Sequence, residues 1–319
     1  MDEFEIIKKY FQKISKNNPA ALQLNDDVFF DRKNNLVTSV DTYNEGIHFP
    51  NFKFPNLIIK KILRSSISDL ISKGVQPKYY FISGSGNKNH FTKKNLKKIS
   101  QSLLSEQKKY NIKLSGGDTT FSKKASFCII SIGFSKKIVP RNKAQSNDDI
   151  YVTGNIGDSY LGMLAIKKKI KINKNLKKYF VNKYYCPNLP FNICNHLNKF
   201  ANTSIDISDG LFSDLEKLIN KQNLSYEINL NKIPTSQKFK NYIIKFKKNK
   251  KNYLSNGDDY QILFTASAHK RSLIHLFRKK MNQKITRIGK IVKGSKKNLI
   301  KINNKPQNLN DFKGYSHKF

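Results

Sequence analysis

The fold of this chain is organised around residues 114–120, which read Leu114-Ser115-Gly116-Gly117-Asp118-Thr119-Thr120. An amphipathic run with apolar residues at helical spacing, 92–110, precedes them, and a β-rich apolar run, 125–134, follows. Two glycines, a carboxylate and two hydroxyls between a helix and a strand predict a tight turn. At such a turn the backbone can approach a phosphate and Asp118 can hold its metal. The structural alternative is a turn in which Asp118 only accepts local N–H bonds.

Strands and helices alternate on both sides of this turn, which indicates a mixed α/β fold. In the first half we expect helices at 2–14, 57–73 and 92–110, and strands at 24–31, 36–42, 79–83 and 125–134. In the second half we expect strands at 149–153, 204–208, 225–230, 259–265, 285–292 and 299–302, with helices from 158, at 211–221 and at 270–280. The length of 319 residues and the polar connection 140–149 predict two domains, 1–140 and 141–319.

The net charge of +38 would ordinarily suggest a nucleic-acid partner. Only six of the 60 basic residues are Arg, however, and recognition of bases and phosphates favours the forked guanidinium. The lysines are also scattered along the chain rather than gathered in one stripe. We therefore interpret them as solvated faces, and keep a basic nucleic-acid-binding protein as the alternative from another class.

Cysteine usage and hydropathy address the compartment. The three cysteines, Cys128, Cys186 and Cys194, have no metal-binding spacing and indicate a reducing environment. The start of the chain, Met1-Asp2-Glu3-Phe4, does not resemble a secretory signal, and no apolar run approaches the length of a membrane span. These features predict a cytoplasmic protein with no membrane partner.

The acidic residues are informative because they are scarce, 22 against 60 basic residues. Several lie beside glycine, hydroxyl residues or predicted strands: Asp26, Asp27, Asp41, Asp69, Asp118, Asp206, Asp209, Asp258 and Asp259. A group of carboxylates without a histidine or cysteine cluster favours a hard cation such as Mg²⁺. Protein-bound Mg²⁺ is commonly also coordinated by substrate phosphates. No Walker A loop and no protein-kinase motif set is present, so those phosphotransfer classes are poorly supported.

Eight short motifs follow one another along the chain: Leu24-Asn25-Asp26-Asp27, Ser39-Val40-Asp41-Thr42 with Gly46 and His48, Ser68-Asp69-Leu70, Gly116-Gly117-Asp118-Thr119-Thr120, Tyr151-Val152-Thr153-Gly154, Ile207-Ser208-Asp209-Gly210-Leu211, Gly257-Asp258-Asp259-Tyr260 and Lys313-Gly314-Tyr315. They occur in the order expected of thiamine-monophosphate kinases, and the chain resembles that family along nearly its whole length. A single piece of this kind is weak, whereas eight in order are specific.

The resemblance implies a two-domain architecture like that of aminoimidazole ribonucleotide synthetase, with N-terminal domains that pair in a homodimer. It implies ATP-dependent phosphorylation of thiamine monophosphate to thiamine diphosphate, the last step of thiamine diphosphate biosynthesis, with several Mg²⁺ ions. The implied metal ligands are Asp26, Asp27, Ser39, Val40, Asp41, Asp69, Asp118, Asp206 and Asp209. ATP would meet Gly117, Asp118, Arg141 and Ser208, and the thiamine end would meet His48, Asp258 and Tyr315.

The chain departs from the family pattern at several places. The family's glycine, threonine, asparagine and tryptophan are replaced here by Asn25, Val40, Ser66 and Phe312 respectively. Val40 keeps only a backbone carbonyl as a ligand. The acidic pair after Gly257 has Asp258 as its first member, one methylene shorter than the family's residue, and an Arg-Pro-rich stretch is reduced to Cys186-Pro187-Asn188-Leu189-Pro190. The acids themselves persist, so we expect activity.

The reaction needs no dedicated base, because the acceptor is a phosphate oxygen that is already ionised. Positioning and charge neutralisation can supply most of the catalysis, so we expect direct in-line transfer with Asp118 the most critical residue. The nearest alternatives are other ATP-dependent enzymes of the same fold, aminoimidazole ribonucleotide synthetase and selenophosphate synthetase. The second would need a reactive N-terminal cysteine or selenocysteine, and the first cysteine here is Cys128.

Overall fold

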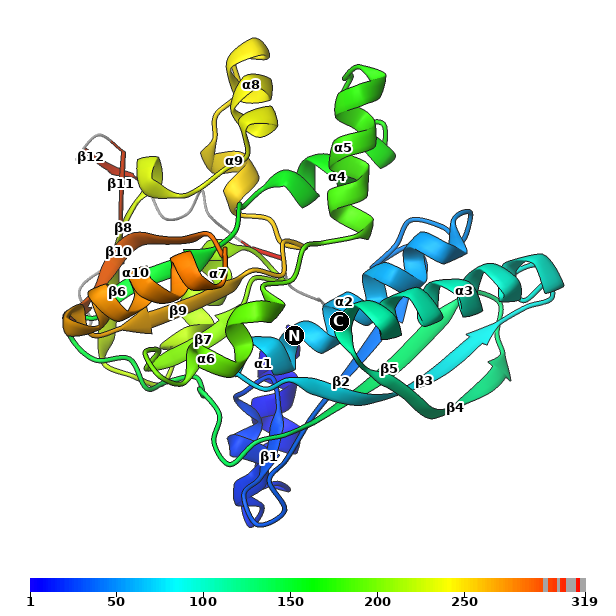
Figure 1. Cartoon of the computed structure of the whole chain (residues 1–319), viewed down its shortest axis with the longest axis horizontal. Helices are drawn as coiled ribbons and strands as arrows, with labels where there is room; N and C mark the ends of the chain where they lie inside the picture. Colours follow the sequence, from blue (N-terminus) through cyan, green and yellow to red (C-terminus); the bar gives the residue numbers. More distant parts are fainter. Residues whose placement is uncertain (295–297, 303–304, 308–313, 316–319) are drawn as a thin grey trace.

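Two β-sheets divide the structure, and a different half of the chain forms each (Figure 1). The computed structural model describes residues 1–294, 298–302, 305–307 and 314–315. Phe312 and Lys313 of the C-terminal motif lie outside the described residues. The mixed α/β fold expected from the alternating pattern is confirmed.

The first sheet has the strand order β1-β2-β5-β3-β4. Its strands are β1 (Phe29–Asp31), β2 (Leu36–Asn44), β3 (Pro77–Gly86), β4 (Lys113–Phe121) and β5 (Ser126–Phe134). All neighbours are antiparallel except β3 and β4, which are parallel and are joined through α3 (Lys93–Tyr110). β2 begins at the predicted residue, Leu36, and continues two residues past the predicted end at 42, to Asn44.

The tight turn expected at 116–120 is also wrong, because these residues lie inside β4. Gly117 is needed because strand β3, not a phosphate, comes close to it. A Cβ at this position would lie 1.9 Å from the carbonyl oxygen of Ile82 on β3. Gly116 has a φ of +151° and sits where the register between β3 and β4 shifts, which is typical of a β-bulge. The glycines therefore allow two backbones to pack closely and bend the strand.

Helix α2 (Pro55–Ser72) is the central packing element, and it contacts β2, β5, β7, α3 and α5. Its apolar residues surround the helix rather than forming one stripe, as expected for a helix that is buried on most sides. Ile58, Ile59, Ile62, Leu63 and Ile67 are each 0% exposed and belong to one core with residues of both sheets. α2 thus holds the two halves of the chain against each other.

The serines near the centre of α2 find protein partners. Ser66 shares a hydrogen bond of 2.9 Å with Ser131 of β5, and Ser68 donates one of 2.7 Å to Asp206 of β7. Gly74 follows the helix with a φ of +75°, the left-handed conformation expected of a residue that ends a helix. The helix consequently ends three residues after Asp69, once it has brought Ser68 and Asp69 to β7.

The second sheet has the order β12-β11-β8-β10-β6-β9-β7. Its strands are β6 (Asp149–Thr153), β7 (Thr203–Asp206), β8 (Leu224–Asn229), β9 (Ile262–Ala266), β10 (Ile285–Lys293), β11 (Leu299–Ile302) and β12 (Lys305–Gln307). Only β8 and β11 pair in parallel; the other pairs are antiparallel. The sheet is therefore mixed as well.

The remaining helices surround the second sheet or extend away from it (Figure 1). They are α4 (Asp158–Ile166), α5 (Lys174–Tyr185), α6 (Cys194–Leu197), α7 (Leu211–Leu218), α8 (Gln237–Lys245), α9 (Lys251–Leu254) and α10 (Arg271–Lys280). The sequence pattern did not predict α6, α8 and α9, which are short or rich in lysine. Among the described helices, none has the length and apolar character that crossing a membrane requires.

Candidate active site

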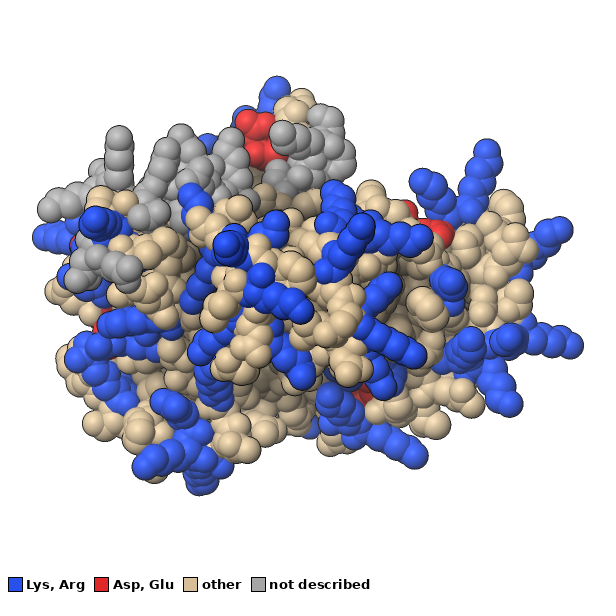
Figure 2. Space-filling view, turned by 90° about the horizontal axis from the view of Figure 1, so that it is seen from above, with Lys and Arg blue, Asp and Glu red and all other residues tan. Residues whose placement is uncertain are grey.

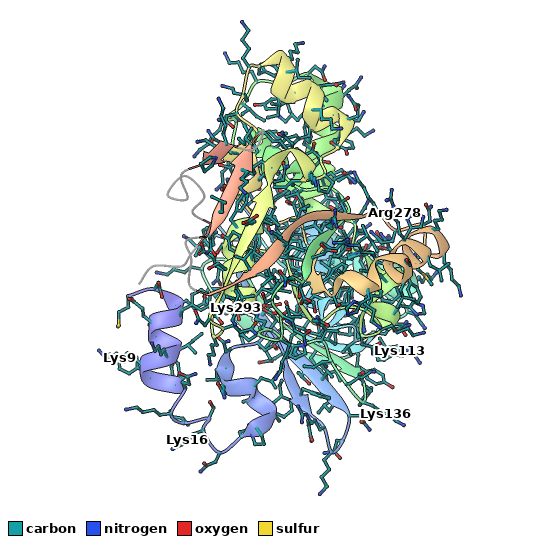
Figure 3. All side chains as sticks on the ribbon, turned by 90° about the vertical axis from the view of Figure 1, so that its left-hand side faces the viewer. Lys9, Lys16, Lys113, Lys136, Arg278 and Lys293 are labelled. Carbon is teal, nitrogen blue, oxygen red and sulfur yellow. The ribbon has the colours of Figure 1, made fainter. Side chains whose placement is uncertain are left out.

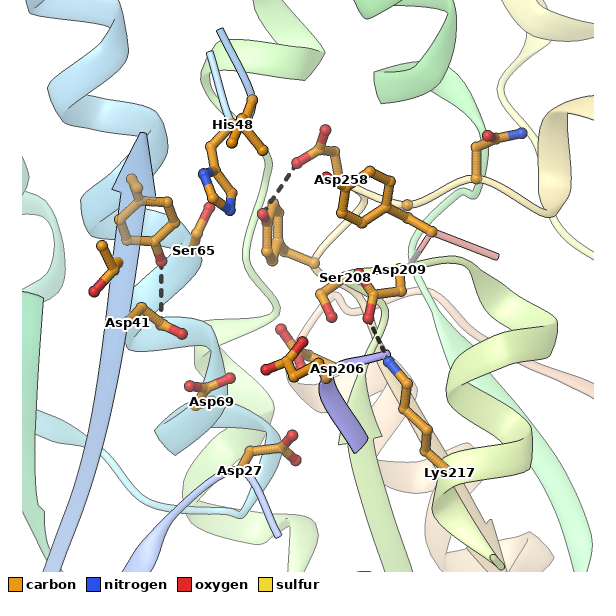
Figure 4. A pocket seen from close by; sticks show the side chains of 18 of the residues that line it. Asp27, Asp41, His48, Ser65, Asp69, Asp206, Ser208, Asp209, Lys217 and Asp258 are labelled. Carbon is orange, nitrogen blue, oxygen red and sulfur yellow. Dashed lines mark hydrogen bonds and ion pairs between the residues drawn. The ribbon is translucent and has the colours of Figure 1, made fainter. Parts of the chain in front are cut away.

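A cavity of about 700 Å³ lies between the two halves of the chain and is lined by both (Figure 4). In Figure 4, Asp41 and Asp69 reach it from β2 and α2, and Asp206, Ser208 and Asp209 reach it from the facing elements of the second half. The lining includes these residues predicted from the sequence: Asp26, Asp27, Val40, Asp41, His48, Asp69, Arg141, Asp206, Ser208, Asp209, Asp258 and Tyr315. Residues far apart in the chain are thus brought to one place.

Carboxylates gather at one end of this cavity. One oxygen from each of Asp27, Asp69 and Asp206 lies within 4.8 Å of the other two. Three carboxylate oxygens at this spacing are the hard donors that Mg²⁺ prefers, so the residues present fit a divalent cation. Asp41 lies on β2 beside this group and accepts a hydrogen bond of 3.1 Å from the hydroxyl of Tyr43.

Three of the acids at this end, Asp41, Asp69 and Asp206, have raised pKa values when no cation is bound. Burial, together with the charges of Asp41 and Asp206, raises the pKa of Asp69 well above its ordinary value. Burial also raises the pKa of Asp41, and it raises that of Asp206 to about 6 although Ser68 donates a hydrogen bond to it. A bound cation would favour the ionised forms, because an opposite charge offsets both burial and mutual repulsion.

Asp26 and Asp27 are held by two cations of the chain itself. The Lys73 ammonium lies 2.8 Å from Asp26 and 2.6 Å from Asp27. The Arg141 guanidinium forms a fork with Asp27, and the Arg141 backbone N–H donates to Asp26 at 2.8 Å. Arg141 therefore comes to the cavity as predicted, but within the described structure its side chain is paired with an acid.

The turn Ser208-Asp209-Gly210 is shaped by a buried acid that the sequence did not single out. The carboxylate of Asp214, on α7, accepts from all three backbone N–H groups of this turn at 3.0 to 3.1 Å. Gly257 approaches the same turn so closely that a Cβ there would lie 1.6 Å from the Ser208 carbonyl oxygen. Lys217 pairs with both Asp209 and Asp214. Ser208 and Asp209 are consequently fixed at the cavity wall.

The other end of the cavity is aromatic. His48 lies there, and its Nδ1 accepts from the backbone N–H of Asn44 at 2.9 Å, which leaves the proton of the neutral ring on Nε2. Asp258 faces it (Figure 4), and it accepts from the Tyr260 hydroxyl at 3.0 Å and pairs with Lys61. Tyr315 returns from the C-terminal tail, where its backbone N–H donates to the Asp209 carbonyl at 3.0 Å.

Lys61 is a buried cation beside this end of the cavity, with only 1% of its surface exposed. Its ammonium lies 4.0 Å from the ring centroid of Tyr184 and 5.6 Å from that of Tyr260, so aromatic faces and Asp258 surround it. Burial lowers the pKa of Lys61, and the charge of Asp258 opposes that shift. The position of Asp258 at the cavity thus depends on a buried cation beneath it.

The N-terminal helix α1 (Glu3–Ile6) forms one wall of the cavity. Glu3 and Phe4 both line it, and the Phe4 ring lies 5.3 Å from the Lys217 ammonium. An amphipathic helix was predicted over 2–14, and the structure has α1 followed by a single π-helical segment, Ile7–Phe11. The sequence did not indicate that this helix covers the site.

Three predicted site residues do not line the cavity: Ser39, Gly117 and Asp118. Ser39 is buried just behind it, where its hydroxyl donates to the Ser66 carbonyl at 3.3 Å. Asp118 lies on β4, three strand positions from β2, which is roughly 14 Å at about 4.8 Å per strand. Within a single chain the structure does not bring Asp118 to the carboxylates.

The sequence reasoning missed Lys61, Lys73 and Lys217, the cations that pair with the acids of the cavity. Lysine is so frequent in this chain that one more could not be singled out. The position of Lys61 inside an apolar helical run, 57–73, was the one available signal, because lysine is rarely buried unless it is paired.

Comparisons with known proteins show which family this chain resembles. Residues 17–135 match the family model described as AIR synthase related protein, N-terminal domain. The chain is 35% identical to a protein of Buchnera aphidicola subsp. Acyrthosiphon pisum named thiamine-monophosphate kinase, over 91% of this chain and 90% of that protein. A protein of the same name from Haemophilus influenzae is 31% identical, over 99% of this chain and 98% of that protein.

A solved structure extends the likeness to three dimensions. It is described as AaThiL complexed with AMPPCP and TMP, and it superposes with a TM-score of 0.85 at 25% sequence identity. The superposition covers 99% of this chain and 97% of that one. The similarity therefore extends over both sheets.

Proposed function

The chain belongs to the thiamine-monophosphate kinase family, and on that premise we propose that it transfers the γ-phosphoryl group of ATP to thiamine monophosphate, giving thiamine diphosphate and ADP. The convergence of acids from both halves of the chain is the observation that carries this proposal. Asp27 and Asp69 from the first half and Asp206 from the second meet at one end of the cavity. A cation-binding end and an aromatic end suit a phosphorylated, ring-containing acceptor.

The roles of the acidic end follow from its chemistry. Asp26, Asp27, Ser39, Asp41, Asp69, Asp206, Asp209 and the Val40 carbonyl are the proposed ligands for Mg²⁺ in this chain. When bound, Mg²⁺ would neutralise the phosphates and reduce the repulsion between ATP and the acceptor phosphate. The Arg141 guanidinium and Ser208, which lies on a turn fixed by Asp214, are proposed to hold the ATP phosphates.

The aromatic end is proposed to hold the thiamine ring system. Asp258 can balance the positive charge of the thiazolium, and Tyr260 and Lys61 keep its carboxylate directed to the cavity. His48 and Tyr315 offer a ring N–H and a phenol at the same end. None of these groups must remove a proton, because the acceptor phosphate is ionised at neutral pH.

The activity is tested by incubating the purified chain with ATP, Mg²⁺ and thiamine monophosphate and separating the products by chromatography. We expect thiamine diphosphate to accumulate with an equal amount of ADP. Folded protein that forms no thiamine diphosphate would overturn the proposed function and favour another ATP-dependent enzyme of this fold.

The transfer is proposed to be direct and in line. The described cavity lining has no cysteine, and its single histidine, His48, uses Nδ1 to accept from the Asn44 backbone. The ionised phosphate of the acceptor can attack the γ-phosphoryl group itself, so incubation with ATP labelled at the γ-phosphate, without acceptor, should leave no label on the protein. A phosphoprotein that passes its label to thiamine monophosphate would contradict direct transfer.

The chain is further proposed to act as a homodimer that pairs through the first sheet. One face of this sheet packs on α2, while the other presents half-buried or exposed apolar side chains, including Val40, Tyr79, Ile130, Ile132 and Phe134. An uncovered apolar sheet face of this kind is typical of an interface. A second copy is the occupant that the family resemblance implies.

Open strand edges support the same pairing. Among the described residues β4 pairs only with β3, and the part of β2 that pairs only with β5 is 39–44, which carries Asp41. Pairing β4 of one copy with 39–44 of the other would remove both edges. It would also bring Gly117 and Asp118 of the second copy beside the acidic end of the cavity, where they are proposed to meet ATP and metal.

Mixing two inactive variants tests this exchange. Let one chain carry Asp69→Asn and the other Asp118→Asn, and let equal amounts dissociate and reassociate. If Asp118 serves the partner's site, each mixed dimer has one intact site, and about a quarter of the wild-type activity should return. If Asp118 serves its own chain or no site, mixing restores nothing.

The chain is proposed to divide into domains at 1–140 and 141–319, supported by the separate sheets on either side of that point. A cytoplasmic location is proposed because ATP and thiamine monophosphate are cytoplasmic metabolites. Neither ATP nor thiamine monophosphate chemistry requires a nucleic-acid or membrane partner.

A further inference from the structure

Lys73 is the most deeply placed cation of the acidic end. It follows the last residue of α2, and it is 0% exposed. Its ammonium has three N–H donors, and three oxygens receive them: Asp26 at 2.8 Å, Asp27 at 2.6 Å and the Ser204 carbonyl at 2.8 Å. All three N–H donors of the ammonium are therefore used in contacts with protein oxygens.

The charges around Lys73 balance within a closed group. Asp26 and Asp27 supply two negative charges, and Lys73 and Arg141 supply two positive ones. A buried ammonium is tolerated only when it is paired and hydrogen-bonded, and this one is both. The fold thus neutralises the first acidic pair of the site with its own side chains.

The other acids at this end are treated differently. Asp41, Asp69 and Asp206 take no part in the ion pairs formed among the described residues; Asp41 accepts a hydrogen bond from Tyr43, and Asp206 accepts one from Ser68. They are left to an external cation, which Asp27 can share because one of its oxygens lies within 4.8 Å of an oxygen of Asp69 and of Asp206. Asp26 and Asp27, by contrast, are already paired with Lys73. The acidic end is therefore divided into a part with a built-in cation and a part without.

We propose that Lys73 is a built-in cation that takes the place of one divalent ion, so that the chain binds one ion fewer than its carboxylates could otherwise hold. The inference rests on the proposed function, because that function assigns Mg²⁺ to these acids. Lys73 does not touch the reacting atoms in this account; it is a positioning residue that holds Asp26 and Asp27 for Arg141 and the remaining metal.

Counting bound Mn²⁺ tests the proposal without any turnover. The full-length chain is titrated with Mn²⁺ alone, and free Mn²⁺ is measured by electron paramagnetic resonance. Lys73→Met keeps the aliphatic stem but removes the charge, and it should bind one more Mn²⁺ per chain than wild type. Its Tm should also gain at least about 5 °C more from Mn²⁺ than the wild-type Tm does.

Three further variants make the outcome decisive. Lys73→Arg keeps the charge and should bind the wild-type number of ions, and Lys73→Gln should behave like Lys73→Met. Arg64→Met removes another buried cation of the same helix, one that pairs with Glu106 away from the cavity, and should add no ion. An unchanged count in a folded neutral variant would overturn the proposal. So would neutral variants that stay unfolded even in excess Mn²⁺, because a metal could then not replace the ammonium.

The result is independent of the proposed reaction. Mn²⁺ is counted with neither ATP nor thiamine monophosphate present, so an inactive chain can still show the extra site in Lys73→Met. Conversely, an active kinase in which Lys73→Met binds no additional ion would remove only the role of Lys73.

Discussion

The Asp69 carboxylate illustrates how a residue can serve a reaction at the expense of stability. It lies with Asp27 and Asp206 within 4.8 Å, and burial and its neighbours raise its pKa well above the ordinary value. Without a cation, the folded state must therefore confine a carboxylate that it cannot neutralise. Asp69→Asn should raise the Tm of the metal-free protein by a few degrees and lower kcat/KM by at least about 100-fold.

Both quantities are measured on one preparation, by thermal unfolding in EDTA and by the kinase assay with Mg²⁺. The control is Asp31→Asn, which alters a partly exposed acid at the end of β1 that accepts from Asn34 and does not line the cavity. The control should retain turnover. A lower Tm for Asp69→Asn in EDTA would mean that the carboxylate stabilises the metal-free protein.

Asp206 gives this end of the cavity a defined pH dependence. Its pKa rises from 3.8 to about 6 in the folded protein, first because of burial. A raised carboxyl pKa means that folding favours the protonated form, so its contribution is fully present below pH 3.8 and is lost as the pH rises through about 6. The metal-free protein should lose on the order of 2 kcal/mol of stability from this group over that range.

The measurement compares Tm at pH 5.0 and pH 7.5 in EDTA for wild type and for Asp206→Asn. Wild type should be more stable at the lower pH, and the variant should show a smaller difference. Saturating Mg²⁺ should remove or reverse the difference, because metal ligands must be deprotonated. Equal pH dependence in wild type and variant would assign the effect to other groups.

The sequence identified the acids of the site, but it did not identify the cations that pair with them. Asp26, Asp27, Asp69 and Asp206 stood out because acids are scarce beside 60 basic residues, and the structure brings them to one cavity. Lys73 could not be distinguished from other lysines, since its importance comes from burial beside an acidic pair. Burial of that kind depends on how α2 meets β7, which no local pattern encodes.

Elements were predicted best where one residue period dominates. The runs 92–110 and 149–153 became α3 and β6 nearly as expected. β4 was missed because its two glycines, Gly116 and Gly117, have turn chemistry, and only the packing of β3 against them explains their presence in a strand. The pairing of β3 with β4, which α3 separates in the chain, cannot be detected in a short stretch of sequence.

The exposed face of the first sheet can be tested as the interface between two copies of the chain. Phe134 ends β5 with 52% exposure, and its ring centroid lies 6.2 Å from that of Tyr79 on β3. If this face pairs two copies, Phe134→Glu buries a charge in the interface and should convert the dimer to a monomer. Light scattering coupled to size exclusion gives the mass, and circular dichroism checks the fold.

The matched control is Ile244→Glu, which alters a 75% exposed residue of α8 on the second half of the chain. Its mass should equal that of wild type. A wild-type chain that is monomeric at micromolar concentration, or a Phe134→Glu variant that remains dimeric, would place the interface elsewhere.

For the whole molecule, the arrangement of the two halves is what the sequence left open. The motifs named the residues, yet the meeting of Ser68 with Asp206, 138 positions apart, follows from the way α2 joins the two halves in one core. The sequence could not predict that α1 would cover one wall of the cavity, because that contact joins the first residues to Lys217.

The charge of the whole molecule offers a last test, because +38 is far more than one site can use. Figure 2 shows Lys and Arg spread over an entire face, and the labelled residues in Figure 3 project from separate elements. Such a field attracts ATP, which is a polyanion, and thiamine monophosphate, whose phosphate outweighs its thiazolium charge, from a distance that salt shortens. Raising the ionic strength from about 0.05 M to about 0.3 M should therefore lower kcat/KM for thiamine monophosphate several-fold and leave kcat within about twofold.

Charge reversal away from the cavity separates this field from local contacts. Lys16 and Lys136 do not line the cavity, so Lys16→Glu with Lys136→Glu should lower kcat/KM at low salt and match wild type at high salt. The double glutamine variant should show about half the effect, since it removes half the charge. If the glutamate variant differs from wild type equally at both salt concentrations, the lysines act through local structure. If neither salt nor charge reversal alters kcat/KM, the positive field does not guide the substrates, and its origin is compositional.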